Sequence, residues 1–115
     1  HAEPATLAEL SARVGSIEDT QLGGWYSYRA SQAALNLLLR SLAMVWRVSH
    51  RIVTVVALHP GTVRSRLSEA FLSEGYPHRV LSPEESAAAL LAVIDNLGPE
   101  ESGSFFDWQG KRIPW

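Results

Sequence analysis

Apolar and small residues recur every three or four positions over the stretch that follows the Gly23-Gly24 pair. They are Tyr26, Ala30, Ala33, Ala34, Leu37, Leu38, Leu42, Val45 and Trp46. Such spacing brings side chains onto one face of an α-helix. The pattern predicts a helix from about Tyr26 to Trp46. A loop over residues 11–24 precedes it, because glycines interrupt regular structure there.

A second stretch, from Ile52 to Leu58, is an unbroken apolar run rich in β-branched residues. A strand that is apolar on both faces is typical of a parallel sheet covered by helices. The run ends at His59-Pro60-Gly61. Because open α/β sheets bind ligands at the carboxyl ends of their strands, the segment Pro60-Gly61-Thr62-Val63 is a candidate binding loop. A simple turn that ends the strand is the alternative interpretation.

Another helix start lies at Ser82-Pro83-Glu84-Glu85, a capping box with proline at the first helical position. We expect this helix to reach Gly98-Pro99 and to be buried, because its middle is apolar nearly all round. A last short strand is predicted over residues 103–108. Residues 1–10 fit a short strand or a weak helix. This alternation of strands and helices predicts an α/β fold with right-handed crossovers.

The composition narrows the function classes. The 115 residues are 46% hydrophobic with a formal net charge of -2, which fits one soluble domain without a basic footprint for nucleic acid. There is no cysteine, so disulfides and thiolate metal sites are excluded, and the histidines and acids show no metal-ligand spacing. The longest apolar run, Ala87 to Ile94, is too short to span a membrane. No signal peptide is recognisable, so we expect a cytoplasmic location.

The sequence contains three ordered blocks of a known family. Tyr28-Arg29-Ala30-Ser31-Gln32-Ala33-Ala34-Leu35-Asn36 resembles the Tyr-x-Ala-Ser-Lys-x-Ala-Leu-Asn block of the short-chain dehydrogenase/reductase family. Residues 11–17 are similar to its catalytic-serine segment, and residues 59–63 resemble its Pro-Gly loop. Within this family, the segments at residues 23–29 and 105–115 look most like those of the C-factor or sniffer-type carbonyl reductases.

The resemblance implies a partial domain. Family members begin with a strand, a Gly-rich turn and a helix that hold the dinucleotide, and no such fingerprint exists here. Residues 1–115 therefore resemble the C-terminal half of a Rossmann-like doubly wound parallel sheet, with about three strands and flanking helices. Its first strand would be Ala5 to Leu10. The half that binds the dinucleotide would be absent, so we expect this chain alone to bind NAD or NADP weakly.

The resemblance also implies roles in hydride transfer between nicotinamide and a small carbonyl or alcohol substrate. Tyr28 would exchange a proton with the substrate oxygen, and Ser11 or Ser16 would polarise that oxygen. The sequence Gly15-Ser16-Ile17 favours Ser16 slightly, because Gly-Ser-Ile recurs in the carbonyl-reductase branch of the family. Pro60 and Gly61 would form the loop in which Thr62 and the Val63 backbone hold the nicotinamide carboxamide. Either serine could equally be a loop-capping hydroxyl.

Position 32 departs from the family pattern. A free phenol has a pKa of about 10, so a working site must stabilise phenolate. The family uses a lysine one helical turn after the tyrosine, where Gln32 can donate a hydrogen bond but carries no charge. Arg29 lies about 100° away around the helix and is a poor substitute. We therefore expect impaired oxidoreductase activity, with a pseudoenzyme module for binding or oligomerisation as the alternative.

Several other residues have structural interpretations. Tyr28 could be a core or interface tyrosine, His59 a structural histidine, and Asp107 and Lys111 solvated residues beside a turn. Without the family's preceding elements, the strand at Ala5 to Leu10 would have an open edge, which tends to pair with another chain. Outward apolar residues of the long helix would also be exposed, and Leu35, Leu39 and Val45 are the candidates. We therefore expect a homo-oligomer.

Overall fold

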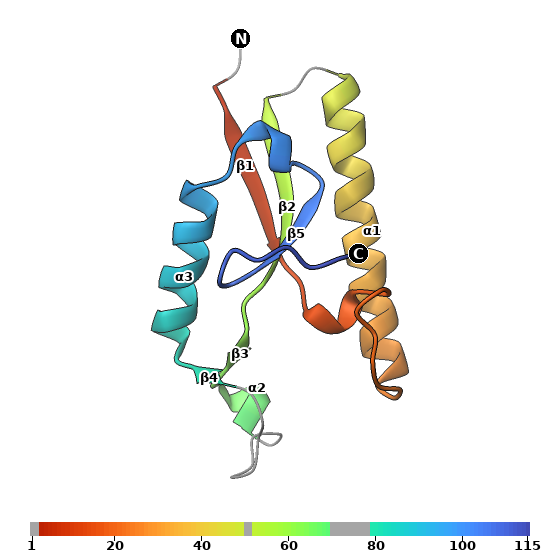
Figure 1. Ribbon diagram of the computed structural model, residues 1–115, viewed down its shortest axis with the longest axis vertical. Helices are drawn as coiled ribbons and strands as arrows, with labels where there is room; N and C mark the ends of the chain where they lie inside the picture. Colours follow the sequence, from red (N-terminus) through yellow and green to blue (C-terminus); the bar gives the residue numbers. More distant parts are fainter. Residues whose placement is uncertain (1–2, 50–51, 70–78) are drawn as a thin grey trace.

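The computed structural model describes residues 3–49, 52–69 and 79–115. Its centre is a parallel sheet in the order β1-β2-β5 (Figure 1). The strands are β1 (Ala5–Leu10), β2 (Val53–His59) and β5 (Ser104–Asp107). This confirms the α/β class with three parallel strands. The structure also shows that the segment near the N-terminus is a strand and not a helix.

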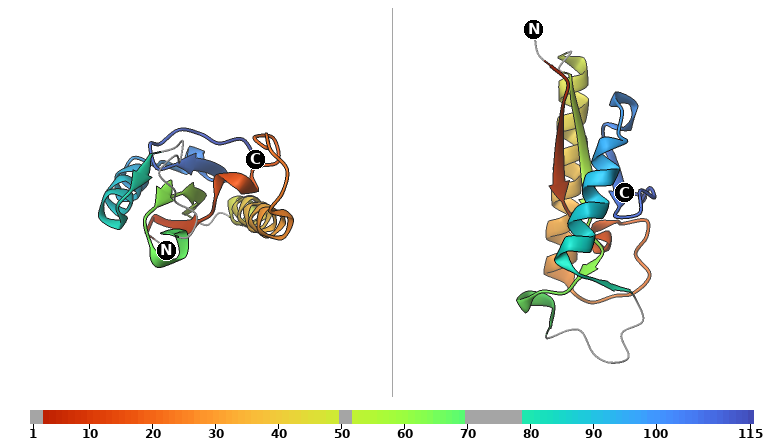
Figure 2. Two further views of the ribbon diagram at one scale, coloured as in Figure 1. Left: turned by 90° about the horizontal axis from the view of Figure 1, so that it is seen from below. Right: turned by 90° about the vertical axis from the view of Figure 1, so that its left-hand side faces the viewer.

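The central strand β2 explains why its sequence is apolar at every position. Val55 and Ala57 pack toward α1 (Tyr26–Val48), whereas Val56 and Leu58 pack toward α3 (Pro83–Asp95). The two helices therefore cover opposite faces of the sheet (Figure 2). Because β2 has a partner strand on each side and a helix on each face, it is buried from Thr54 to Leu58.

The long helix α1 extends two residues beyond its predicted end at Trp46. It buries Asn36, Leu39 and Ala43. The prediction that Leu35 and Leu39 face outward was wrong, because Leu39 lies in the core and Leu35 packs against it. Val45 is exposed as expected. The other large apolar residues that this helix exposes are Tyr26, Tyr28, Leu37, Leu38, Met44 and Val48.

The helix α3 begins with the predicted capping box: Ser82 accepts a hydrogen bond from the Glu85 amide, and the Glu85 side chain accepts one from the Ser82 amide. It ends at Asp95, earlier than the expected Gly98-Pro99 break, and a short 3-10 turn η2 (Pro99–Glu101) follows. The expectation of a buried helix was wrong. Only Ser86 and Leu90 are buried, because a helix against one sheet face leaves its other side in solvent.

The remaining elements lie at the edges. The strand β1 is an edge strand with largely exposed residues, as expected. A second, two-stranded parallel sheet pairs β3 (Thr62–Val63) with β4 (Val80–Leu81), and the short helix α2 (Arg66–Glu69) follows β3. Within the described ranges, no helix is both long and apolar enough to cross a membrane.

Candidate active site

The carboxyl ends of the three main strands meet at one end of the sheet, close to the start of α1 and to the 3-10 turn η1 (Arg13–Gly15) (Figure 1). A groove of about 480 Å³ lies there. Its polar walls include Arg13, Arg29, His59, Thr62, Arg79 and Asp107. This is the end at which a parallel sheet presents ligand-binding residues.

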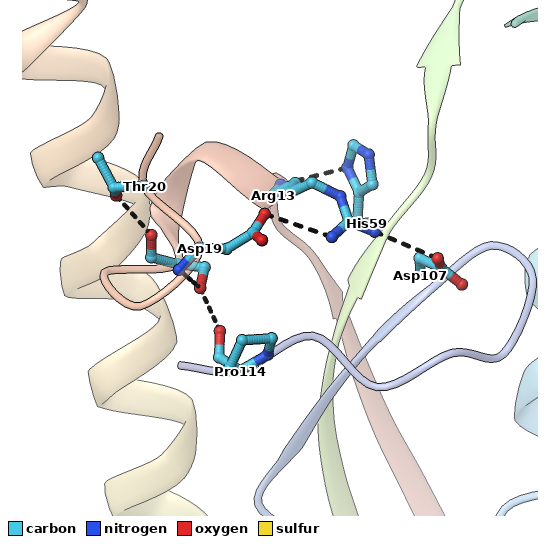
Figure 3. A network of polar contacts seen from close by, with 7 residues as sticks. Arg13, Asp19, Thr20, His59, Asp107 and Pro114 are labelled. Atoms are coloured by element: carbon cyan, nitrogen blue, oxygen red, sulfur yellow. Dashed lines mark hydrogen bonds and ion pairs between the residues drawn. The ribbon is translucent and has the colours of Figure 1, made fainter. Parts of the chain in front are cut away.

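Asp107, the last residue of β5, is buried and organises this end of the sheet. Its Oδ1 accepts hydrogen bonds from the amides of Gln109 and Lys111, both at 2.9 Å. Its Oδ2 lies 3.2 Å from Nη2 of Arg13, whose Nη1 lies 3.4 Å from Oδ2 of Asp19 (Figure 3). The prediction of a solvated Asp107 was wrong, because its carboxylate caps the turn after β5. Lys111 is exposed, as expected.

His59 ends β2 beside this network. Its Nδ1 accepts a hydrogen bond of 3.3 Å from the Arg13 amide, so the proton of the neutral ring is on Nε2 (Figure 3). Burial, helped by the Arg13 guanidinium and opposed by Asp107, lowers the pKa of His59 to about 4. The imidazole is therefore neutral near pH 7. These contacts agree with the structural interpretation of His59.

The two candidate serines are both buried and already hydrogen-bonded within the chain. The Ser11 hydroxyl donates to Oδ1 of Asn36 at 2.5 Å. The Ser16 hydroxyl donates to the Pro114 carbonyl and accepts from the Asp19 amide at 3.1 Å. Neither serine lines the groove. These contacts favour the structural interpretation of both hydroxyls.

Tyr28 and Gln32 lie one turn apart near the start of α1. Tyr28 is 46% exposed, and its ring centroid lies 6.3 Å from that of Trp25. Gln32 lies directly beneath η1, because a Cβ atom on Gly15 would be 2.9 Å from the Gln32 carbonyl carbon and Cβ. Neither Tyr28 nor Gln32 lines the groove, although both are close to its end of the sheet.

The Pro60 to Val63 segment is fixed at the carboxyl end of β2. The Pro60 carbonyl accepts a 2.7 Å hydrogen bond from the buried Ser86 hydroxyl. Gly61 has a φ of +82°, and a Cβ there would be 2.9 Å from side-chain carbons of Leu81 and Trp108. Thr62 and Val63 are not loop residues but form β3. Gly61 and Thr62 line the groove, so this segment is part of the site.

Comparison with known proteins identifies the family. No family model matches the chain. It is 41% identical over 109 residues to the C-signal of Myxococcus xanthus, which covers 95% of this chain and 60% of that protein. It is 41% identical over 113 residues to 1-hydroxy-2-glutathionyl-2-methyl-3-butene dehydrogenase of Rhodococcus sp. (strain AD45), covering 98% of this chain and 48% of that protein.

Among solved structures, NADPH-bound carbonyl reductase from chicken fatty liver aligns with a TM-score of 0.81 and 34% identity, over 96% of this chain and 42% of that one. The chain belongs to the short-chain dehydrogenase/reductase family. Its similarity lies in the branch of the C-signal and the sniffer-type carbonyl reductases. This short-chain dehydrogenase/reductase chain spans about half the length of the relatives it matches.

The family's tyrosine block, residues 28–36, forms the first turns of α1, and Asn36 at its end joins the helix to Ser11. Sequence reasoning missed the charged residues of the groove, above all Arg13 and its link to Asp107. One signal was available, because Arg13 follows shortly after the first candidate strand and Asp107 lies near the end of the last one, where parallel sheets bind ligands. Their pairing across 94 positions has no local signature.

Proposed function

We propose that residues 1–115 are the catalytic and substrate-binding part of an NAD(P)-dependent oxidoreductase that transfers hydride between nicotinamide and a small carbonyl or alcohol substrate. One observation carries the proposal. The tyrosine block of α1 and the Pro60 to Val63 segment, 24 positions apart in the sequence from Asn36 to Pro60, lie at the same end of a parallel sheet. Family resemblance and this placement agree on where the chemistry would occur.

The residues present fit the nicotinamide end of the cofactor. A nicotinamide in the groove would supply or accept the hydride. Gly61 and Thr62 form part of the groove wall, and Gly61 is packed against Leu81 and Trp108. On the proposed assignment, Thr62 and the Val63 backbone hold the carboxamide. No Gly-rich turn that could hold the pyrophosphate follows a strand in the described part, so the affinity of this chain alone for NAD or NADP is low.

Tyr28 is the proposed proton donor and acceptor for the substrate oxygen, and its exposed ring leaves room for a substrate. Ser11 or Ser16 would polarise the same oxygen only if its hydroxyl left its present partner. Gln32, the proposed aid to Tyr28, offers an amide and no charge. Each pKa unit of phenolate stabilisation that is missing costs about 1.4 kcal/mol. We therefore propose that hydride transfer is slow in this chain.

A rate measurement tests this proposal. The chain is joined to the dinucleotide-binding half of a relative, and NADPH consumption is followed with small aldehydes and ketones. We expect measurable reduction that Tyr28→Phe abolishes, because phenylalanine cannot move a proton. Ser31→Ala is the control, since its exposed hydroxyl donates to the Tyr28 carbonyl within α1. Activity that survives Tyr28→Phe unchanged would contradict the assignment.

The second candidate is a binding module without turnover. Two observations favour it: β1 leaves one edge of the sheet open, and α1 exposes Leu37, Leu38, Val45 and Val48 on the side away from the core. Open strand edges and contiguous apolar surface both favour association with another chain. We propose that the partner is a second copy of this chain, which makes it a homo-oligomer.

A further inference from the structure

Three arginines stand on the walls of the groove at the carboxyl ends of the strands, and two of them have carboxylate partners. Arg13 lies between Asp19 and Asp107, at 3.4 and 3.2 Å. Arg79 pairs with Glu85 at 2.8 Å, and its guanidinium stacks 5.6 Å from the ring centroid of Trp108. Both positive charges are therefore compensated by the protein itself.

Arg29 is different. Its Nε donates a 2.9 Å hydrogen bond to the Gly24 carbonyl, which holds the side chain in place. Among the described residues, no carboxylate lies within ion-pair distance of Arg29, and its two Nη groups have no hydrogen-bond acceptor. The side chain is half-buried and lines the groove. A held guanidinium with both terminal nitrogens open matches the two oxygens of a carboxylate.

We infer that Arg29 binds a carboxylate of the substrate, and that the substrates are therefore oxo-acids or hydroxy-acids. The inference rests on the proposed function, because it names the substrate class of that site. Arg29 shares the groove with Gly61 and Thr62, the proposed nicotinamide segment, and it follows Tyr28 directly in the sequence. A molecule anchored at Arg29 by its carboxylate would thus lie beside the proposed nicotinamide segment, at the end of the sheet where Tyr28 also lies.

The groove also suits this ligand in size and charge. Its volume of about 480 Å³ is within the range of small-molecule sites, which is about 300 to 1,000 Å³. The described lining holds three arginines and two aspartates, and both aspartates pair with Arg13, so the formal charge of the lining is one unit positive. Among the described residues, Arg29 is therefore the arginine of the groove wall that has no carboxylate partner.

A binding experiment separates this inference from catalysis. The probes are 4-oxopentanoate and its methyl ester, in which a methyl group replaces the negative charge of the carboxylate. Binding to the whole chain is followed by NMR at the arginine Nε–H groups. The variants are Arg29→Gln, Arg29→Lys and, as a control, Arg40→Gln, an exposed arginine on the same helix. A parallel titration with NADPH tests whether the anion belongs to the cofactor.

We expect the acid to bind the wild-type chain roughly tenfold more tightly than the ester, as one charge-assisted pair provides. Arg29→Gln should remove this preference, Arg29→Lys should retain part of it, and Arg40→Gln should leave it unchanged. Equal binding of acid and ester, no saturable binding of the acid, or a preference that survives Arg29→Gln would overturn the inference. So would a loss in Arg29→Gln that is confined to NADPH. All these binding outcomes can be measured even if the chain joined to a dinucleotide-binding half has no oxidoreductase activity.

Discussion

Acid should destabilise the fold through His59. Its Nδ1 accepts the Arg13 amide, its ring is largely buried, and the Arg13 guanidinium is close by. A protonated ring could not accept that hydrogen bond, and its charge would be poorly solvated. Asp107 favours the protonated ring, but its carboxylate is shared with Arg13. Protonation of His59 therefore opposes the folded state.

The direction and magnitude of this loss of stability follow from the pKa of His59. An unfolded histidine titrates near 6.5, whereas the pKa of folded His59 is lowered to about 4. Between these values the unfolded chain binds a proton that the folded chain does not, so the free energy of unfolding decreases as the pH falls. The full loss is about 3 kcal/mol, at about 1.4 kcal/mol per pH unit. About 2 kcal/mol of it should occur between pH 6.5 and 4.5.

Urea unfolding, followed by far-UV circular dichroism at a fixed protein concentration, measures this loss. His59→Gln should lose about 2 kcal/mol less than the wild type over the same pH range, because glutamine does not titrate. Glu85→Gln is the control, since the pKa of Glu85 is lowered from 4.5, and its contribution is lost only as the pH falls toward and below that value. Equal losses in the wild type and His59→Gln would refute the reasoning.

Three other predictions concern packing and association. Gly61→Ala should destabilise by about 1–3 kcal/mol more than Gly24→Ala, because both have a positive φ but only Gly61 lacks space for a Cβ; equal urea midpoints would contradict this. Ser16→Ala should cost about 1–3 kcal/mol, because it leaves the Pro114 carbonyl and Asp19 amide unpaired, whereas Ser31→Ala should be nearly neutral. Light scattering should give the wild type a mass above that of the 12.6 kDa monomer, and the control Leu91→Lys should behave in the same way. The double variant Leu38→Lys with Val45→Lys should be a monomer. A monomeric wild type would show that the exposed face of α1 does not associate.

The elements could be predicted where the local sequence decides them. The unbroken apolar run of β2 and the capping box of α3 each correspond to one structure, and both predictions are confirmed. The face of α1 could not be predicted, because apolar residues occur on more than one side of it. Leu39 and Leu38 are adjacent in the sequence, yet only Leu39 meets the sheet.

The candidate site was only partly predictable for a related reason. The segment around Gly61 follows a predicted strand, so its position at the groove could be inferred. The partners of Ser16 and Arg13 lie at Pro114 and Asp107, near the other end of the chain. Only the folded sheet brings these residues together. Long-range polar contacts of this kind leave no periodicity in the sequence.

The most direct test of the central claim, that α1 carries a proton-transfer site that lacks its charge, is the kinetics of Gln32→Lys. The variant is made in the chain joined to a relative's dinucleotide-binding half, and carbonyl reduction is measured by NADPH consumption near neutral pH. Because general acid–base catalysis contributes about 10²- to 10⁴-fold, restoring the cation should raise kcat/KM by at least about tenfold. Adding Tyr28→Phe should abolish that gain. Equal rates for Gln32 and Gln32→Lys, or a gain that persists without the Tyr28 hydroxyl, would contradict the account.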